Sequence, residues 1–162
     1  MITAPEGGKV DPNNYTIERY YSMEKIPEEY REYVEEIGEI KGNLAYTLGY
    51  VKVTKNEFND TLYVYMNNVG DKLRFEIRIY PEEIQRVRET YPGYTFEREF
   101  EDEGISFDVL SKEESSGEYT YIMYFYYGKE KYIVIGRNDE DRIQDIVIAY
   151  KNVVLSHEGN QQ

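Results

Sequence analysis

Residues 119–155, YTYIMYFYYGKEKYIVIGRNDEDRIQDIVIAYKNVVL, decide the fold of this chain. The first nine residues are almost continuously aromatic or β-branched, Gly128 and Lys129 supply a turn, and residues 131–136 return as a second strand. A helix is expected next, because Asp139 is a good N-cap and apolar residues recur after it at helical spacing. These apolar residues are Ile143, Ile146, Val147, Tyr150 and Val154. The pattern predicts a hairpin that feeds a C-terminal amphipathic helix.

The composition limits the classes of protein to consider. A chain of 162 residues is long enough for one domain with a core that needs no disulfides or metals. The absence of cysteine excludes disulfide scaffolds, thiolate zinc sites and cysteine nucleophiles. The formal net charge of -13 disfavours binding to nucleic acid or to an anionic membrane surface. No stretch is apolar for long enough to form a transmembrane segment.

The two ends of the chain read as less structured than the middle. Residues 1–14 are polar, with two prolines and two glycines in close succession, and we expect a disordered linker there. Residues 156–162, SHEGNQQ, are expected to form a frayed tail. The sequence therefore predicts a single α+β domain over residues 15–155.

Two further segments have helical patterns. Residues 28–37 follow Pro27, which suits a first helical position, and apolar side chains recur there at helical spacing, so we favour a helix over a strand. A second short helix is expected over residues 82–91, because Ile84 and Val87 align on one face and Pro92 ends the run.

Alternating or β-branched segments fill the rest of the domain. They are residues 43–53, 61–66, 72–80, 94–100 and 105–110. Gly49 inside the first of them suggests a bulge or a strong bend. The clearest alternation is in residues 72–80, where we expect one apolar face and one solvent-facing side that exposes Lys72, Arg74 and Arg78. Together the segments predict a twisted antiparallel sheet of about six to eight strands packed on the C-terminal helix.

Tyrosine is the most unusual component, with 19 Tyr, 6 Phe and no Trp. Alternation in residues 119–127 divides the rings between the two faces of the strand. The simplest interpretation is that these rings belong to the core and only their hydroxyl groups reach water. The alternative is an aromatic groove for a sugar, peptide or lipid. Its candidate ligand-binding residues are Tyr119, Tyr121, Tyr124, Tyr126 and Tyr132.

Catalytic and metal-binding patterns find little support. The one histidine, His157, falls in the expected tail, where it could not act as a positioned base or ligand. No nucleophile elbow, phosphate-binding glycine loop or zinc-protease motif occurs. Asn138 and the acidic residues at 139–141 suit a helix N-terminus, and the acidic residues within 99–103 suit a solvated hairpin turn. We therefore expect no enzyme activity, no cofactor and no metal.

Two stretches together resemble a known family. The sequence IERYYSMEKIPEEYREYVEE near the start is similar to the opening of the DUF4367 domain, and MYFYYGKEKYIVIGRNDEDRIQDIV is similar to its end. The matching positions are Ile26, Pro27, Glu28, Tyr30, Tyr132, Gly136 and the helix from Glu140 onward. Two positions depart from the pattern: Glu29 stands where the family has glycine, and Tyr124 or Phe125 stands where a tryptophan is expected.

The resemblance implies an extracytoplasmic domain of Gram-positive bacteria, with a sheet similar to the half-barrel of lipoprotein carriers. It implies no catalytic residue and no ligand. Our first functional hypothesis is therefore a noncatalytic sensor or binding domain from an exported or membrane-anchored protein, with a small molecule, peptide or protein as its partner. The alternative is a cytoplasmic acidic protein, similar to an inhibitor, that binds a basic partner.

Overall fold

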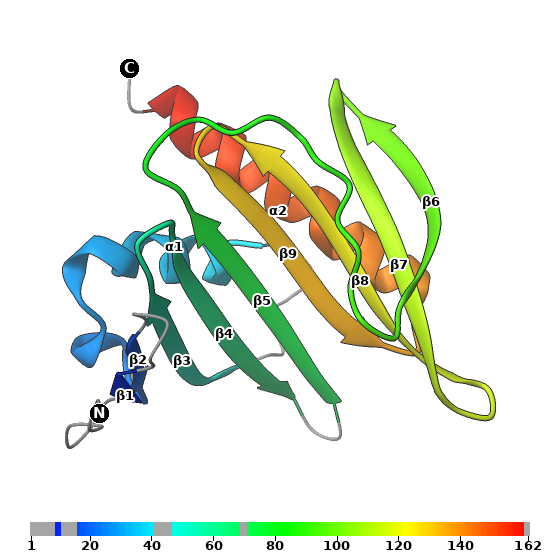
Figure 1. Ribbon diagram of the computed structural model, residues 1–162, viewed down its shortest axis with the longest axis horizontal. Helices are drawn as coiled ribbons and strands as arrows, with labels where there is room; N and C mark the ends of the chain where they lie inside the picture. The colour runs from blue at the N-terminus through cyan, green and yellow to red at the C-terminus, as the bar shows by residue number, and fades with distance from the viewer. Residues whose placement is uncertain (1–8, 11–15, 41–46, 69–70, 161–162) are drawn as a thin grey trace.

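The computed structural model describes residues 9–10, 16–40, 47–68 and 71–160. Their strands form one antiparallel sheet with the order β1-β2-β3-β4-β5-β9-β8-β7-β6 (Figure 1). The strands are β1 (Lys9–Val10), β2 (Thr16–Tyr20), β3 (Thr47–Lys55), β4 (Asp60–Asn68), β5 (Asp71–Ile79), β6 (Thr95–Asp102), β7 (Ile105–Ser115), β8 (Glu118–Tyr127) and β9 (Glu130–Arg137). The helices are a short 3-10 turn (Met23–Lys25), α1 (Glu28–Gly38) and α2 (Glu140–Asn160).

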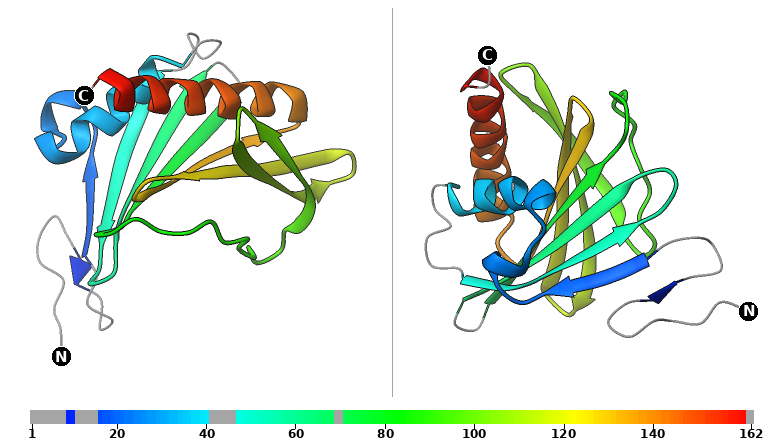
Figure 2. Two further views of the ribbon diagram at one scale, coloured as in Figure 1. Left: turned by 90° about the horizontal axis from the view of Figure 1, so that it is seen from above. Right: turned by 90° about the vertical axis from the view of Figure 1, so that its left-hand side faces the viewer.

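This arrangement confirms the predicted α+β class, the antiparallel sheet and the C-terminal helix. The sheet of the described residues is open, with β1 and β6 at its edges, so the half-barrel stays a prediction. The chain leaves the middle of the sheet after β5 and enters again at the far edge as β6. The connecting residues 80–94 cross one face of the sheet, and α2 crosses the opposite face (Figure 2).

The predicted hairpin and helix start are confirmed in detail. Strands β8 and β9 pair from Thr120 with Arg137 to Tyr127 with Glu130, and Gly128 in the turn has a φ of 62°. Asp139 caps α2, because its carboxylate accepts a hydrogen bond from the backbone N–H of Arg142 at 3.1 Å.

One face of the sheet packs on the helices and forms the main core. Its buried residues include the five that the sequence placed on the inner face of α2, each at most 3% exposed. Gly136 of β9 lies directly beneath α2: a Cβ there would lie 2.8 Å from Ile143 Cδ1 and 2.9 Å from Leu73 Cδ1. A larger residue at this position would require the ends of the Ile143 and Leu73 side chains to shift, so glycine suits the close packing there.

The opposite face is covered by residues 80–94, which we call the strap. The structure shows no helix there, so the helix predicted over residues 82–91 is wrong. The backbone of the strap bonds to sheet side chains instead: the N–H of Glu89 donates to Tyr124 Oη at 2.9 Å, and the C=O of Val87 accepts from Tyr126 Oη at 2.9 Å. These bonds replace the helical ones that the local pattern suggested.

A buried lysine joins the strap to the sheet. Lys131 of β9 has no exposed surface, and its Nζ lies 2.9 Å from a carboxylate oxygen of Glu89 and 2.7 Å from Tyr91 Oη. The same Nζ lies 3.9 Å from the centre of the Tyr124 ring. Burial lowers the pKa of Lys131 to about 8, and the hydrogen bond to Glu89 opposes this effect.

One side of β5 was expected to face solvent, but the strap covers much of it. The predicted alternation is present, because Leu73, Phe75 and Ile77 are buried in the main core. On the other face, however, Glu76 is only 6% exposed, and Arg78 is partly buried with an ion pair to Glu89 at 3.0 Å. The face is wet only in part, since the strap and its ion pairs cover much of it.

Several smaller predictions can also be compared with the structure. Residues 28–37 are helical, and a bulge in β3 lies between Leu48 and Tyr50, where Gly49 suggested one. The predicted tail is wrong up to Asn160, because α2 continues to that residue. Strand β1 lies inside the predicted linker, so the prediction of disorder is wrong at residues 9–10. The other residues of the predicted linker fall outside the described part of the chain. Neither helix in the described part of the chain has the apolar length that crossing a membrane requires.

We expect Ile146→Ala to lower the free energy of unfolding by about 2–5 kcal/mol, because it opens a cavity between α2 and the sheet. Ile146 is 2% exposed in the main core. Chemical denaturation measures the change. Asn152→Ala on the exposed side of the same helix is the control and should change stability by less than about 0.5 kcal/mol. Equal stabilities of Ile146→Ala and wild type would contradict the packing described.

We expect Glu89→Gln to destabilise the protein by about 2 kcal/mol or more, because it leaves the buried Lys131 ammonium without its anionic partner. Glu83→Gln is the matched control, since Glu83 is exposed in the same strap. Thermal unfolding of both variants tests the prediction. A Glu89→Gln variant as stable as Glu83→Gln would show that the ion pair does not hold the strap.

Candidate functional site

The five tyrosines proposed as a binding groove lie on different surfaces. Tyr124 and Tyr126 pack under the strap, whereas Tyr121 and Tyr132 pack against the main core on the helix side. Tyr119 is 37% exposed near the start of β8, and its ring centre is 6.2 Å from that of Tyr121. The structure therefore does not bring these five rings together in one groove.

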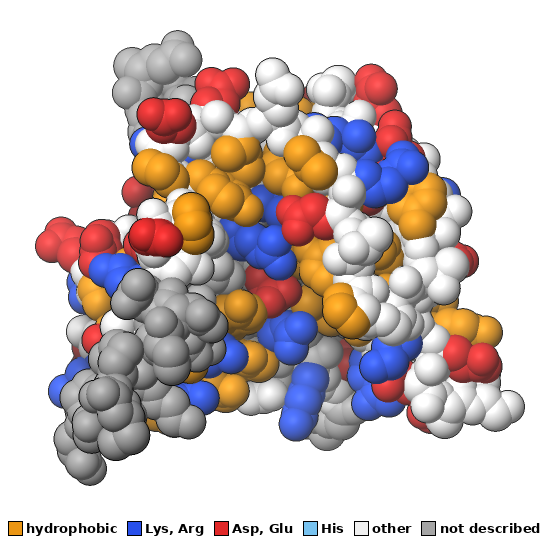
Figure 3. All heavy atoms as spheres, viewed as in Figure 1, with side chains coloured by type: hydrophobic (Ala, Val, Ile, Leu, Met, Phe, Trp, Pro, Cys, Tyr) orange, Lys and Arg blue, Asp and Glu red, His pale blue; other side chains and the backbone are white. Residues whose placement is uncertain are grey.

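A pocket of about 260 Å³ does open beside the strap, on the face of the sheet that Figure 3 shows. Strands β4, β5, β8 and β9 form its floor, and Tyr94 at the end of the strap forms one side. The lining residues are Tyr65, Met66, Asn67, Lys72, Leu73, Arg74, Tyr94, Thr120, Ile135, Gly136 and Arg137. We call this the cationic pocket, because its charged lining residues are all basic.

The cations of this pocket have few anionic partners. Arg74 makes no hydrogen bond or ion pair with any described residue, and its buried Nε has no acceptor. Its guanidinium lies over the Tyr65 ring at 5.8 Å from the centre. Lys72 makes no ion pair among the described residues, and Arg137 lies 3.8 Å from Glu118 with both side chains about half exposed. Glu76 lies close enough to Arg74 for the two charges to interact, and Arg137 has Glu118, so the described part of the chain neutralises the positive charge of this pocket only in part.

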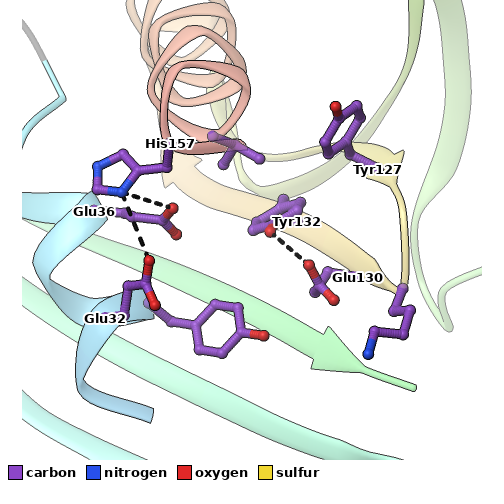
Figure 4. Close-up of a pocket in the computed structure, with 9 residues that line it drawn as sticks. Glu32, Glu36, Tyr127, Glu130, Tyr132 and His157 are labelled. Carbon is purple, nitrogen blue, oxygen red and sulfur yellow. Dashed lines mark hydrogen bonds and ion pairs between the residues drawn. The ribbon is translucent and has the colours of Figure 1, made fainter. Parts of the chain in front are cut away.

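A second pocket, of about 250 Å³, lies on the other face of the sheet where α1, α2 and the β8–β9 turn meet (Figure 4). Its lining residues are Glu32, Tyr33, Glu36, Tyr127, Lys129, Glu130, Tyr132, Val154 and His157. We call it the acid–histidine pocket. Glu32 and Glu36 lie one turn apart on α1 and point toward His157 of α2, as Figure 4 shows.

Helix α2 places His157 in this pocket. The residue continues the packing face of the helix, three positions after Val154 and seven after Tyr150. Its Nε2 lies 2.6 Å from a carboxylate oxygen of Glu39, while Nδ1 lies 3.7 Å from Glu36 and 3.8 Å from Glu32. His157 is therefore a positioned side chain, which corrects its assignment to a tail.

The charges in the acid–histidine pocket affect one another. Burial raises the pKa of Glu36 to about 7, against the opposing effect of His157, and the negative charges of Glu32 and Glu39 raise it further. Burial disfavours the charged form of His157, but its hydrogen bond to Glu39 and the charge of Glu36 raise its pKa overall. The pocket therefore holds protons more tightly than its separate groups would in water.

The arrangement gives no clear catalytic pair. Glu36 and Glu76 are both buried carboxylates with a raised pKa, but they lie on opposite faces of the sheet. A pair of buried acids in one cleft would have indicated acid–base catalysis. The expectation of a noncatalytic protein stays a prediction.

Comparisons of this chain with family models, with curated proteins and with solved structures found no match. The resemblance to DUF4367 therefore stays a prediction as well. The proposals for its function therefore rest on the chemistry of the cationic pocket and the acid–histidine pocket, two of the pockets in the described part of the chain.

The sequence placed Lys72 and Arg74 on the polar face of a strand without predicting a pocket there, and it gave no role in a site to His157 or Arg137. The missed signal for His157 was helical spacing, because the apolar face of residues 143–154 continues to position 157. For Arg137 no signal was available in the sequence, since pairing of β9 beside β5 is a long-range contact.

We expect the stability of the wild type to lose a contribution from Glu36 as the pH rises from 4.5 to 7. The reason is that the folded state keeps this carboxyl protonated up to a pKa of about 7, against an ordinary value of 4.5. Glu36→Gln resembles the protonated form at every pH, so its stability relative to wild type should be higher at pH 8 than at pH 4.

Urea denaturation at both pH values measures this difference. Glu35→Gln on the exposed side of α1 removes the same charge and reports the effect of net charge alone. If Glu36→Gln changes the free energy of unfolding equally at the two pH values after this correction, the surroundings of Glu36 do not raise its pKa.

Proposed function

We propose that this protein is a noncatalytic binding domain whose cationic pocket takes a small molecule with an anionic group on an aromatic or apolar body. The anionic group is a carboxylate or a phosphate, which accepts hydrogen bonds from guanidinium and ammonium groups. The proposal retains the binding-domain hypothesis from the sequence and moves its site from the five tyrosines to the side of the strap.

The observation that carries the proposal is that the buried Nε of Arg74 has no hydrogen-bond acceptor. A buried polar atom without a partner costs about 1–3 kcal/mol, and native proteins rarely leave such an atom unpaired. Here the Nε of Arg74 lacks an acceptor in a chain with 32 acidic residues that could supply one. An anionic ligand would satisfy Arg74, and Lys72 and Arg137 would add positive charge from the neighbouring positions.

The rest of the lining suits the body of such a molecule. Ile135, from the strap-side cluster, contributes apolar surface to the floor, and the Tyr65 and Tyr94 rings stand beside it. Tyrosine offers a large contact area at a small cost in rotamer entropy and retains a hydroxyl group for hydrogen bonds. At about 260 Å³ the pocket is close to the lower end of small-molecule sites, roughly 300 Å³.

The charge distribution favours a small anion over a nucleic acid. Figure 3 shows basic side chains over the middle and lower part of this face, with acidic ones both among them in the middle and around the rim. A long polyanion would have to pass those acids and the field of a chain with net charge -13. A compact anion can contact the basic residues of the pocket without extending over those acids.

The lining residues also support a binding role without chemistry. Among the described residues, neither a carboxylate nor a histidine lines this pocket, so it lacks the usual general bases. The extracytoplasmic location and the family implied by the resemblance remain part of the proposal as predictions.

We expect phenyl phosphate to bind in the cationic pocket of the wild type and Arg74→Gln to weaken this binding about tenfold or more. A charge-assisted hydrogen bond contributes roughly 1.5–3 kcal/mol, and 1.4 kcal/mol corresponds to a factor of ten. Titration followed by backbone amide NMR measures the affinity and shows which residues respond.

Lys25→Gln is the matched control, because Lys25 is an exposed basic residue outside the pocket. Inorganic phosphate tests whether the aromatic body contributes, and should bind more weakly than phenyl phosphate. Equal loss in Arg74→Gln and Lys25→Gln, or chemical shift changes spread over the whole surface, would contradict a specific site.

A further inference from the structure

The acid–histidine pocket lies on the opposite face of the sheet and is independent of the proposed function. We propose that it is a zinc site, in which Nδ1 of His157 and the carboxylates of Glu32 and Glu36 bind the metal ion. One ligand atom from each of these residues can be chosen so that all three lie within 4.8 Å of one another. Two helices that are far apart in the sequence supply them.

The separation of these atoms requires only a small adjustment to bind a metal. Zinc binds nitrogen and carboxylate oxygen at about 2.0–2.2 Å, so tetrahedral ligands lie roughly 3.3–3.6 Å apart. Glu32 is exposed on α1 and can turn toward the ion, whereas Glu36 and His157 are already held by the packing of the helices. The site is thus nearly organised before the ion arrives.

Glu36 places a largely buried carboxylate in this pocket. Its side chain is 7% exposed, points to His157 and receives no hydrogen bond from a described residue. The hydroxyl of Tyr150 is fully buried and also has no partner among the described residues. The charge of Glu36 raises the pKa of Tyr150, which places this hydroxyl near the pocket, while Glu36 itself has His157 as an ion-pair partner. Buried polar groups without partners often mark the place of an ion or a water molecule.

Glu39 binds the imidazole nitrogen of His157 that would not contact the metal, and so supports the site from outside its ligands. With the proton of neutral His157 on Nε2, the imidazole donates to Glu39 at 2.6 Å and leaves Nδ1 free to face Glu32 and Glu36. This carboxylate–histidine–metal arrangement fixes the tautomer and raises the basicity of the coordinating nitrogen. Metal binding then releases the proton that His157 carries at low pH.

The donor set favours zinc over calcium or magnesium. One imidazole nitrogen with two carboxylates suits zinc, while calcium and magnesium prefer sites made only of oxygen. A fourth position stays open to water, since the pocket has a volume of about 250 Å³. The competing explanation is a purely protein-internal cluster in which protonated His157 pairs with the three glutamates.

Isothermal titration calorimetry of the full chain with zinc chloride at pH 7.5 separates the two explanations. We expect one equivalent to bind, with proton release seen as a dependence of the heat on the buffer. Glu36→Gln should weaken binding roughly 10–100-fold, the range found even for loss of an outer partner. Glu35→Gln, with the same charge change on the exposed side of α1, should bind as the wild type does. Equal affinities of the two variants would overturn the site.

A second measurement needs no substitution. Nitrogen-15 NMR of the imidazole should show the Nδ1 resonance of His157 shifting with zinc, whereas Nε2 keeps its proton and its bond to Glu39. Magnesium at the same concentration should leave both resonances in place. No zinc response at Nδ1 would show that the cluster holds only a proton. The amide resonances of the cationic pocket should not respond to zinc, so failure here leaves the test with phenyl phosphate intact.

Discussion

The need to bury both faces of the β8–β9 hairpin constrains the whole structure. Its residues are apolar or aromatic on both sides, so a single covering layer would leave one set exposed to water. Helix α2 covers one face and excludes water from Phe125, Tyr132 and Val134. The strap covers the other face above Ile122, Tyr124 and Ile133. Strand β9 lies inside the sheet between β5 and β8, where both of its edges are paired.

The two covers differ in chemistry, and this difference places the pockets. Helix α2 packs through apolar side chains, and the acid–histidine pocket opens where it meets α1 near its C-terminal end. The strap is held by ion pairs and tyrosine hydroxyl groups around Lys131, and the cationic pocket opens beside its last residue, Tyr94. Each pocket therefore lies at the border of a cover, where the core ends and polar groups begin. One pocket lined by acidic groups and one lined by basic groups thus lie on opposite faces of one sheet.

Much of the fold could be predicted from local patterns. Residues 119–155 specify their hairpin, N-cap and helix because alternation, turn glycine and helical spacing all agree there. The strap could not be predicted, since Ile84 and Val87 have helical spacing while the true partners of the segment, Tyr124 and Lys131, lie far along the chain. Arg74 was recognised as a basic residue on a polar face, but its missing acceptor is visible only in three dimensions.

Chemical labelling of the tyrosines tests the two-sided burial most directly. Nitration of the native protein followed by peptide mass spectrometry gives a rate for each ring. We expect rapid modification of Tyr21, which is 70% exposed, and slow modification of Tyr124 under the strap and Tyr132 under α2, at 1% and 2% exposure. Both buried rings should react only as the protein unfolds. Modification of Tyr124 as fast as that of Tyr21, with Tyr132 still protected, would show that the strap does not cover its face and would contradict the account.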